Sequence, residues 1–245
     1  MFLSGQTGHS ARGTTSTTGL FAVRIRSTAP VAQGNYSASF SLPASTAKTA
    51  CEVVQSRTLN TGSDDYYAID LMFPSNWQEP STAHWGMVIA QFNYQMIIGA
   101  PVALAAYGDK VAIVVQAGKV TGGLPSHSTG PDNNGYAHCT TATCQVIPQG
   151  QLAPGTWHQV IVHIHWASDM SGSVETWWRR KGNPSWSQQA RYSGPTVQWT
   201  TDPLPANYAT TDKIGAYRGP SPLALSIRND GYCRARTFVA AETCL

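Results

Sequence analysis

The chain has 245 residues, of which only 12% are charged, and its formal net charge is +3. It contains no long run of Lys or Arg, which argues against a nucleic-acid partner or a membrane-surface site. It also contains no stretch of about 18 consecutive apolar residues, so we expect no transmembrane helix. Ser, Thr, Gly, Trp and Tyr are abundant, a composition common in secreted β-proteins that bind sugars.

Runs of β-branched and aromatic residues, separated by Gly and Pro, predict strands along most of the chain. In chain order the predicted strands are Leu20–Ile25, Asn35–Leu42, Cys51–Arg57, Tyr66–Phe73, Gly86–Phe92, Val102–Ala106, Lys110–Gln116, Trp157–Ala167, Ser173–Arg180, Lys213–Tyr217 and Ala235–Ala240. The polar segment Gly118–Ile147 is predicted to be a long loop. The pattern predicts an all-β protein, a sandwich or jelly roll, and the lack of a linker or repeat favours one domain over residues 1–245.

The predicted strand that starts at Trp157 alternates clearly between two faces. One face is predicted to lie in the core and carries Val160, Val162, Ile164 and Trp166. The other face is predicted to meet solvent or a cleft and carries Gln159, Ile161, His163 and His165. His163 and His165 are candidates for substrate contacts or for a base, although such residues are more often surface histidines.

The five cysteines indicate the compartment. Cys139 and Cys144 are close neighbours, and Cys233 and Cys244 bracket the predicted C-terminal strand. Two local disulfides would leave Cys51 unpaired and would indicate an oxidising compartment; five free thiols are the alternative. The first four residues are too short for a signal peptide, as in a mature chain that has lost one. We therefore expect a secreted protein.

Two segments each begin as a predicted strand and end with polar residues two positions apart. A strand buried in an ordinary core would not carry polar residues in this pattern. The two segments are Val88–Tyr94 and Thr211–Gly219. Four further segments accompany them in a fixed order: Pro30–Phe40, Cys51–Val54, Asp65–Asp70 and Trp157–Trp166, the last with the return strand Gly172–Trp178. Over about residues 30 to 220, this ordered set resembles the heparin-lyase-I-like polysaccharide lyases, which include glucuronan lyases; alginate lyases of the jelly-roll type are more distant.

The resemblance implies a two-sheet antiparallel jelly roll with the substrate lying across a concave sheet. It also implies a polysaccharide lyase that cleaves uronic-acid polymers by β-elimination. Gln91 matches the glutamine of a Gln-x-His motif, and Tyr217 matches the tyrosine of Lys-x-Gly-x-Tyr. Gln91 would bind the substrate carboxylate, and Tyr217 would be the proton shuttle. Lys213 shares a strand face with Tyr217 and is its expected helper, whereas Arg218 points the opposite way.

The chain departs from the family pattern at two positions. Asn93 stands where the family has the histidine of Gln-x-His; its amide can bind a carboxylate but cannot act as a base. Ala50 stands where the family tends to have an arginine, two residues before Glu52. Lys48 lies on the same face as Glu52 and is a candidate substitute for that arginine. Trp85 flanks a Pro-rich segment and is a candidate for stacking on a sugar ring.

These departures keep two other functions open. A carbohydrate-binding protein on a lyase scaffold would bind glycans without chemistry. A glycoside hydrolase would need two carboxylates flanking the glycosidic bond, and Glu52 with Asp70 is the only plausible strand-borne pair. The substrate itself stays open among glucuronan, alginate, a glycosaminoglycan and a glucuronoxylan-type chain, although the lack of a basic track disfavours a strongly sulfated one.

No zinc-site spacing occurs in the chain, and we expect neither a catalytic metal nor a cofactor. Calcium could stabilise such a fold, but Asp64, Asp65 and Asp132 do not form a loop with calcium-ligand spacing. We expect a monomer whose partner is the polysaccharide.

Overall fold

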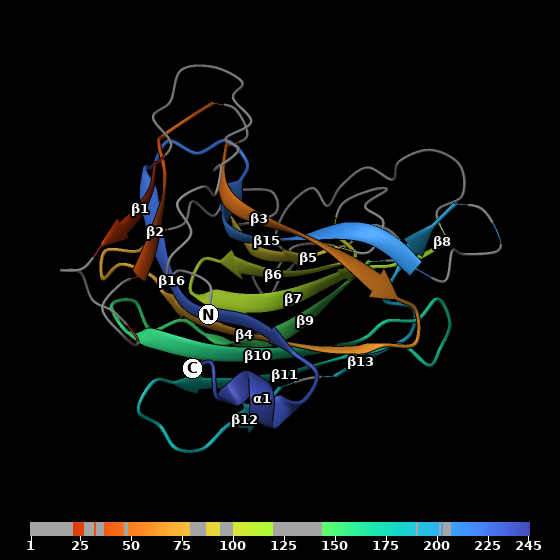
Figure 1. The fold of residues 1–245 in the computed structure, drawn as a ribbon. Helices are drawn as coiled ribbons and strands as arrows, with labels where there is room; N and C mark the ends of the chain where they lie inside the picture. The colour runs from red at the N-terminus through yellow and green to blue at the C-terminus, as the bar shows by residue number, and fades with distance from the viewer. Residues whose placement is uncertain are drawn as a thin grey trace.

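The computed structural model describes residues 22–26, 32, 37–46, 49–78, 87–93, 100–119, 144–189, 191–200, 202 and 207–245. These residues form two antiparallel sheets, which pack face to face, and one short helix (Figure 1). The predicted all-β, two-sheet architecture is confirmed. None of the helices in the described ranges is long and apolar enough to cross a membrane.

The larger sheet has eight strands. In spatial order they are β1 (Ala22–Arg26), β2 (Ser37–Leu42), β16 (Leu225–Ala235), β4 (Asp64–Met72), β10 (Trp157–His165), β11 (Ser173–Arg180) and β12 (Ser187–Gln188), with β13 (Tyr192–Ser193) also paired to β11. The first and last thirds of the chain therefore meet at the centre of this sheet, where β16 lies between β2 and β4.

The second sheet has six strands. In spatial order they are β3 (Thr49–Asn60), β15 (Asn207–Arg218), β5 (Met87–Phe92), β6 (Val102–Tyr107), β7 (Lys110–Gln116) and β9 (Cys144–Gln151). A separate parallel pair is formed by β8 (Gly118–Lys119) and β14 (Gln198–Trp199). In the six-stranded sheet β15 lies between β3 and β5, so it brings the two polar segments singled out from the sequence into adjacent strands.

The core lies between the two sheets and takes one face from each. The face of β10 predicted to be buried is buried: Val160, Val162, Ile164 and Trp166 are all at 0% exposure. This agreement follows from the period of two in a strand, which sends alternate side chains to opposite faces. The other face of β10 was predicted to meet solvent or a cleft, and this is wrong for Gln159, Ile161 and His163, which are also buried because the C-terminal segment and side chains of β4 and β11 cover that face.

Charged side chains also lie between the sheets, near the C-terminal end of β3. Nε of Arg57 is 2.5 Å from Oδ2 of Asp212 on β15, and its Nη1 is 3.5 Å from Oδ2 of Asp65 on β4. Nε of Arg234 on β16 is 2.8 Å from the other oxygen of Asp65. Charges buried in a core must be paired to be tolerated, and this network links β3 and β15 to the opposite sheet.

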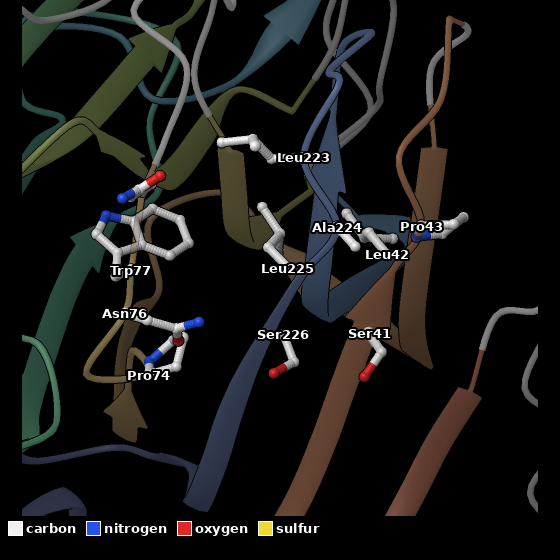
Figure 2. Close-up of a pocket in the computed structure, with 11 residues that line it drawn as sticks. Ser41, Leu42, Pro43, Pro74, Asn76, Trp77, Leu223, Ala224, Leu225 and Ser226 are labelled. Atoms are coloured by element: carbon white, nitrogen blue, oxygen red, sulfur yellow. The ribbon is translucent and has the colours of Figure 1, made fainter.

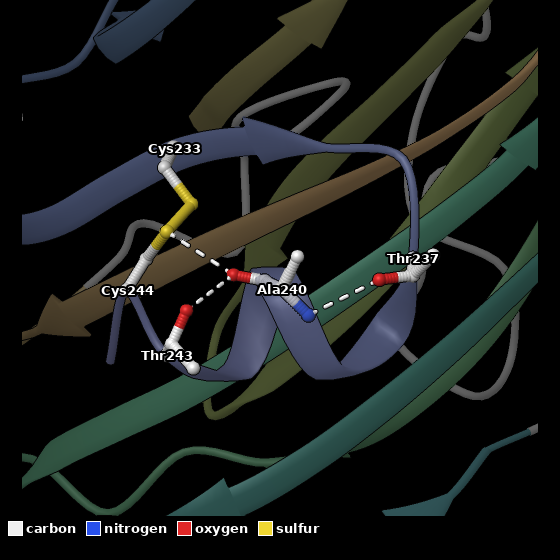
Figure 3. The surroundings of a disulfide bond; sticks show 5 residues. All are labelled: Cys233, Thr237, Ala240, Thr243 and Cys244. Atoms are coloured by element: carbon white, nitrogen blue, oxygen red, sulfur yellow. Dashed lines mark hydrogen bonds between the residues drawn. A yellow bond between two sulfur atoms is a disulfide. The ribbon is translucent and has the colours of Figure 1, made fainter.

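Two sequence predictions about the C-terminal part are corrected. The predicted strand Ala235–Ala240 is wrong, because β16 ends at Ala235 and the helix α1 (Phe238–Glu242) follows. The hydroxyl of Thr237 caps α1 by accepting a hydrogen bond from the Ala240 N–H (Figure 3). The predicted loop Gly118–Ile147 is wrong at both ends, where the structure has β8 (Gly118–Lys119) and the start of β9 at Cys144; residues 120–143 lie outside the described ranges.

The predicted disulfide between Cys233 and Cys244 is confirmed, although it joins the end of β16 to the end of a helix (Figure 3). It holds α1 against the outer face of the eight-stranded sheet, where Ala241 packs on Ala68 and Ile161. Cys51 is buried and unpaired, as predicted. The predicted partner of Cys144, Cys139, lies outside the described residues.

Candidate active site

The outer face of β15 presents the polar groups that the sequence predicted to act together. Lys213 and Tyr217 are partly exposed, whereas the residues that follow each of them, Ile214 and Arg218, are buried. Arg218 faces away from the site, as predicted, and donates hydrogen bonds to the main-chain oxygens of Pro43 and Leu223. Lys213 and Tyr217 therefore share one face.

Glu52 and Gln91 meet on this face although they belong to strands on either side of β15. Nε2 of Gln91 lies 2.6 Å from Oε1 of Glu52. Glu52 pairs with Gly215, and Gln91 pairs with Lys213. The two side chains therefore meet across β15, although their strands are not neighbours.

Gly215 is required at this position by the backbone itself. Its φ of +148° is rarely adopted by residues with a side chain, and a Cβ there would lie 2.2 Å from the main-chain oxygen of Cys51. The pairing of β15 with β5 also shifts between Ile214 and Tyr217. This irregularity turns Tyr217 into register with Val88, so the phenol stands between Val88 and, on β3, Ala50.

The electrostatics of the two titratable groups at the centre of the site are linked. Burial raises the pKa of Glu52, and the charge of Lys213 and the hydrogen bond from Gln91 only partly oppose this rise. Burial also raises the pKa of Tyr217, and the negative charge of Glu52 raises it further. In the free protein Tyr217 is therefore a neutral phenol, a state suited to giving a proton.

Asn93 lies at the end of β5 and is buried. Its Nδ2 is 3.4 Å from Oγ1 of Thr211, which lies two residues before Lys213 on β15. Its main-chain oxygen accepts a hydrogen bond from the hydroxyl of Thr210 at 2.6 Å and lies 3.5 Å from Nη2 of Arg57. Asn93 is thus held next to Gln91 and Lys213, and its Oδ1 makes no hydrogen bond within the described structure.

Short side chains continue the outer face beyond β5. Ala103 pairs with Gln91, and Ala105 pairs with Val88. Ala105 also packs with Ala112 and Val114 of β7. The polar cluster on β3, β15 and β5 is therefore bordered on the β6 side by small apolar residues.

The structure brings together five of the predicted site residues: Tyr217, Gln91, Asn93, Lys213 and Glu52. Two more, Lys48 and Trp85, lie outside the described residues. Thr211 and the need for a glycine at position 215 were not predicted from the sequence. The alternation that grouped Lys213 with Tyr217 would have placed Thr211 on the same face.

His163 and His165 do not belong to this site, because they lie on the outer face of the other sheet. His163 is held between Oδ1 of Asp64 at 2.8 Å and Oε2 of Glu175 at 3.0 Å, and its ring stacks on Tyr66. His165 lies 3.0 Å from the same oxygen of Asp64. The core separates both histidines from Gln91, so they cannot supply a base there.

The carboxylate pair that a hydrolase would need is also divided. Asp70 lies on the outer face of β4, where Lys181 is 3.3 Å from its Oδ2, and Glu52 lies on the outer face of β3. The two groups are on opposite sides of the sandwich and cannot flank one glycosidic bond. Within the described ranges, no group of three or more His, Cys, Asp or Glu side chains is arranged to hold a metal ion.

A cavity of about 520 Å³ lies elsewhere, between the end of β2, the segment after β4 and the start of β16 (Figure 2). Trp77 lines it opposite Leu223 and Leu225. None of the predicted site residues in the described ranges lines this cavity, so it is separate from the polar cluster on β15.

Comparison with known proteins supports the functional assignment of this fold. The family model described as polysaccharide lyase matches residues 24–231. Among solved structures, the endo-β-1,4-glucuronan lyase of the fungus Trichoderma reesei is similar, with a TM-score of 0.62, 16% identity and coverage of 90% of this chain and 89% of that one. A comparison with curated protein sequences finds no match.

Two further structures show how widely the fold is shared. The alginate lyase of Klebsiella pneumoniae has a TM-score of 0.50, 12% identity and coverage of 85% and 84%. The catalytic domain of a glycoside hydrolase family 131 protein from Coprinopsis cinerea has a TM-score of 0.51, 10% identity and coverage of 90% and 85%. At these identities the likeness shows the fold alone, whereas the family match spans most of the sequence. The chain belongs to the polysaccharide lyase family, and the protein is a polysaccharide lyase with a jelly-roll fold.

Proposed function

We propose that this lyase cleaves a uronic-acid-containing polysaccharide by β-elimination on the outer face of the six-stranded sheet. The observation that carries the proposal is the cluster of Gln91, Glu52 and Lys213 next to Tyr217. The similar lyases named above act on glucuronan and alginate, which are both uronate polymers. Substrates of this class carry the carboxylate that the reaction needs.

The first requirement of β-elimination is to make the C5 proton of the uronate acidic. That proton is next to a carboxylate, and its removal builds negative charge on the carboxylate oxygens. Side chains that donate hydrogen bonds to those oxygens stabilise the enolate-like intermediate. Gln91 and Asn93 would donate amide hydrogens, and Lys213 would add a positive charge.

The second requirement is a group that moves the proton. Tyr217 would take the C5 proton and then give a proton to the glycosidic oxygen as the C4–O bond breaks and the C4=C5 double bond forms. The neutral phenol suits the donation. The removal step needs the phenolate, which burial and a charged Glu52 both oppose.

The location of the enzyme, its oligomeric state and its need for a cofactor are also proposed here from its side chains and disulfide. The disulfide between Cys233 and Cys244 favours an oxidising, extracellular compartment. We propose a secreted monomer that needs no cofactor, since the side chains named above supply both the charge and the proton transfer.

Carbohydrate binding without catalysis is the second candidate. It is favoured by Asn93 and Ala50, which stand where the family has a base and a cation, and Asn93 cannot accept the C5 proton. Under this reading the same cluster would hold a uronate but leave the polymer uncut.

An ultraviolet absorbance screen against glucuronan, alginate, a glycosaminoglycan and a glucuronoxylan-type polymer tests the proposal. β-Elimination leaves a double bond conjugated to the carboxylate, which absorbs and which hydrolysis does not produce. We expect rising absorbance with one polymer. A flat trace across the panel, with binding still measurable, would instead support the binding protein.

A further inference from the structure

In the proposed complex, the carboxyl group of Glu52 would lie next to the carboxylate of the bound uronate. The charged or titratable groups that face it are Lys213 and Tyr217 from β15, and β5 contributes the uncharged amide of Gln91. On its own strand the neighbouring thiol of Cys51 is buried on the core side. Within the described structure, Lys213 is thus the one cation facing Glu52.

An ionised Glu52 would conflict with a bound uronate. Two carboxylates would then share Lys213 and Gln91, and like charges that share a site force one of them to take up a proton. The arginine that the family tends to carry two residues earlier is Ala50 here, so no second cation from that position relieves the repulsion.

The hydrogen bonds leave room for that proton. Oε1 of Glu52 accepts from Gln91, which leaves Oε2 to carry a hydrogen. Gln91 uses one of its two amide hydrogens in this bond, and the second has no partner in the described structure. A carboxylate seated here could accept one hydrogen from Gln91 and one from Oε2 of Glu52.

We propose that Glu52 works as a carboxylic acid, donating its proton in a hydrogen bond to the substrate carboxylate in place of the missing arginine. The proton comes from water when the uronate binds. The inference rests on the proposed function, because it assumes that a uronate binds on this face. It also removes the negative charge beside Tyr217, which otherwise opposes the phenolate.

The pH dependence of uronate binding follows from the direction in which the pKa of Glu52 is shifted. The pKa of Glu52 is raised by burial, so the acid form persists above the usual range of a glutamate. Binding that needs the acid form is fully present below this raised pKa and is lost as the pH rises through it. Above the pKa, each pH unit should weaken uronate binding about tenfold.

The test measures binding in the Tyr217→Phe background, so that turnover does not interfere. Titration calorimetry of a glucuronan and an alginate tetrasaccharide, in buffers of different ionisation enthalpy, reports protons taken up on binding. We expect uptake approaching about one proton per tetrasaccharide above the pKa of Glu52. Adding Glu52→Gln should abolish the uptake, because the glutamine amide donates a hydrogen without titrating.

Three variants separate this role from a structural one. Glu52→Gln should bind at acidic pH within about threefold of the background and stay flat as the pH rises, while Glu52→Ala should lose about tenfold. Glu242→Gln is the control, because it replaces the same carboxyl group by an amide on α1, on the opposite side of the sandwich. It should leave the pH dependence of uronate binding unchanged. A thermal melt confirms that each variant is folded.

The proposal is overturned if folded Glu52→Gln binds no uronate at any pH, since the ionised carboxylate would then be the required form. It is also overturned if the background takes up no proton, or if neither tetrasaccharide binds. Failure of the lyase proposal gives a different result: the pH-linked binding stays, but wild-type enzyme forms no unsaturated product.

Discussion

Tyr217 shows how single neighbours decide what a side chain can do. Ala50 and Val88 flank it in the adjacent strands, and neither side chain carries a charge. Its pKa is raised by burial and by Glu52. In the proposed mechanism, removal of the C5 proton by Tyr217 is therefore easier when Glu52 is protonated.

Replacing Tyr217 by Phe should remove the proton shuttle while leaving the packing of the ring in place. Turnover should fall by about 10²- to 10⁴-fold, the usual contribution of general acid–base catalysis. Tetrasaccharide affinity and the unfolding midpoint should stay close to wild type. The initial rate of absorbance increase, measured with a binding titration, checks this; a near-normal rate would remove Tyr217 from the mechanism.

At the scale of elements, β15 organises the site because it is the strand between β3 and β5. Its outer face supplies Lys213 and Tyr217, and Gln91 and Glu52 meet across it from the two neighbouring strands. Its inner face carries Asp212, paired with Arg57 between the sheets. One strand therefore holds candidate catalytic groups on its outer face and an ionic link to the opposite sheet on its inner face.

Gly215→Ala should damage both the strand and the site. The left-handed φ and the 2.2 Å approach to the Cys51 oxygen should destabilise the protein by about 3 kcal/mol and separate Gln91 from Glu52. Gly62→Ala is the matched control, because Gly62 has a φ of +82° but open space around a Cβ. That variant should lose about 1 kcal/mol and keep its activity.

Urea unfolding and kcat/KM on the same polymer measure both effects. Equal losses of stability in the two glycine variants would show that the close approach to β3 is relieved by a backbone shift. Normal kcat/KM in Gly215→Ala would show that the contact between Gln91 and Glu52 is not needed for turnover.

In the whole molecule, the outer faces of the two sheets differ in the groups that they present. The candidate active site lies on the six-stranded sheet. On the other side, α1 lies on the outer face of the eight-stranded sheet (Figure 1), and the disulfide holds it there. The His163 cluster is on that second face too. Changes there reach the active site only through the shared core.

Removing the disulfide should therefore change stability and not catalysis. The bridge closes a loop of 11 residues, so the Cys233→Ser, Cys244→Ser double variant should lose about 3 kcal/mol of unfolding free energy. Its kcat and KM at a temperature well below its melting point should match wild type. A changed KM would mean that the two outer faces are coupled through the core.

Most strands were predictable because alternation and turn residues are local signals. The strands Lys110–Gln116 and Ser173–Arg180 were predicted to the residue, and the buried face of β10 was identified in full. The end of the chain was not, because the run from Ala235 to Ala240 mixes polar with apolar residues and has no clear period. Thr237 as a helix cap was the signal against a strand there.

The order of short motifs in the sequence determined the family, and the period of two placed Lys213 with Tyr217 and Gln91 with Asn93. Tertiary structure alone decided which of these faces meet. It joined Gln91 to Glu52 across Gly215, and it sent His163, His165 and Asp70 to the far side of the core. The physical reason is that alternation tells which residues of one strand share a face, whereas the pairing of distant strands and the packing of the two sheets determine which faces lie together.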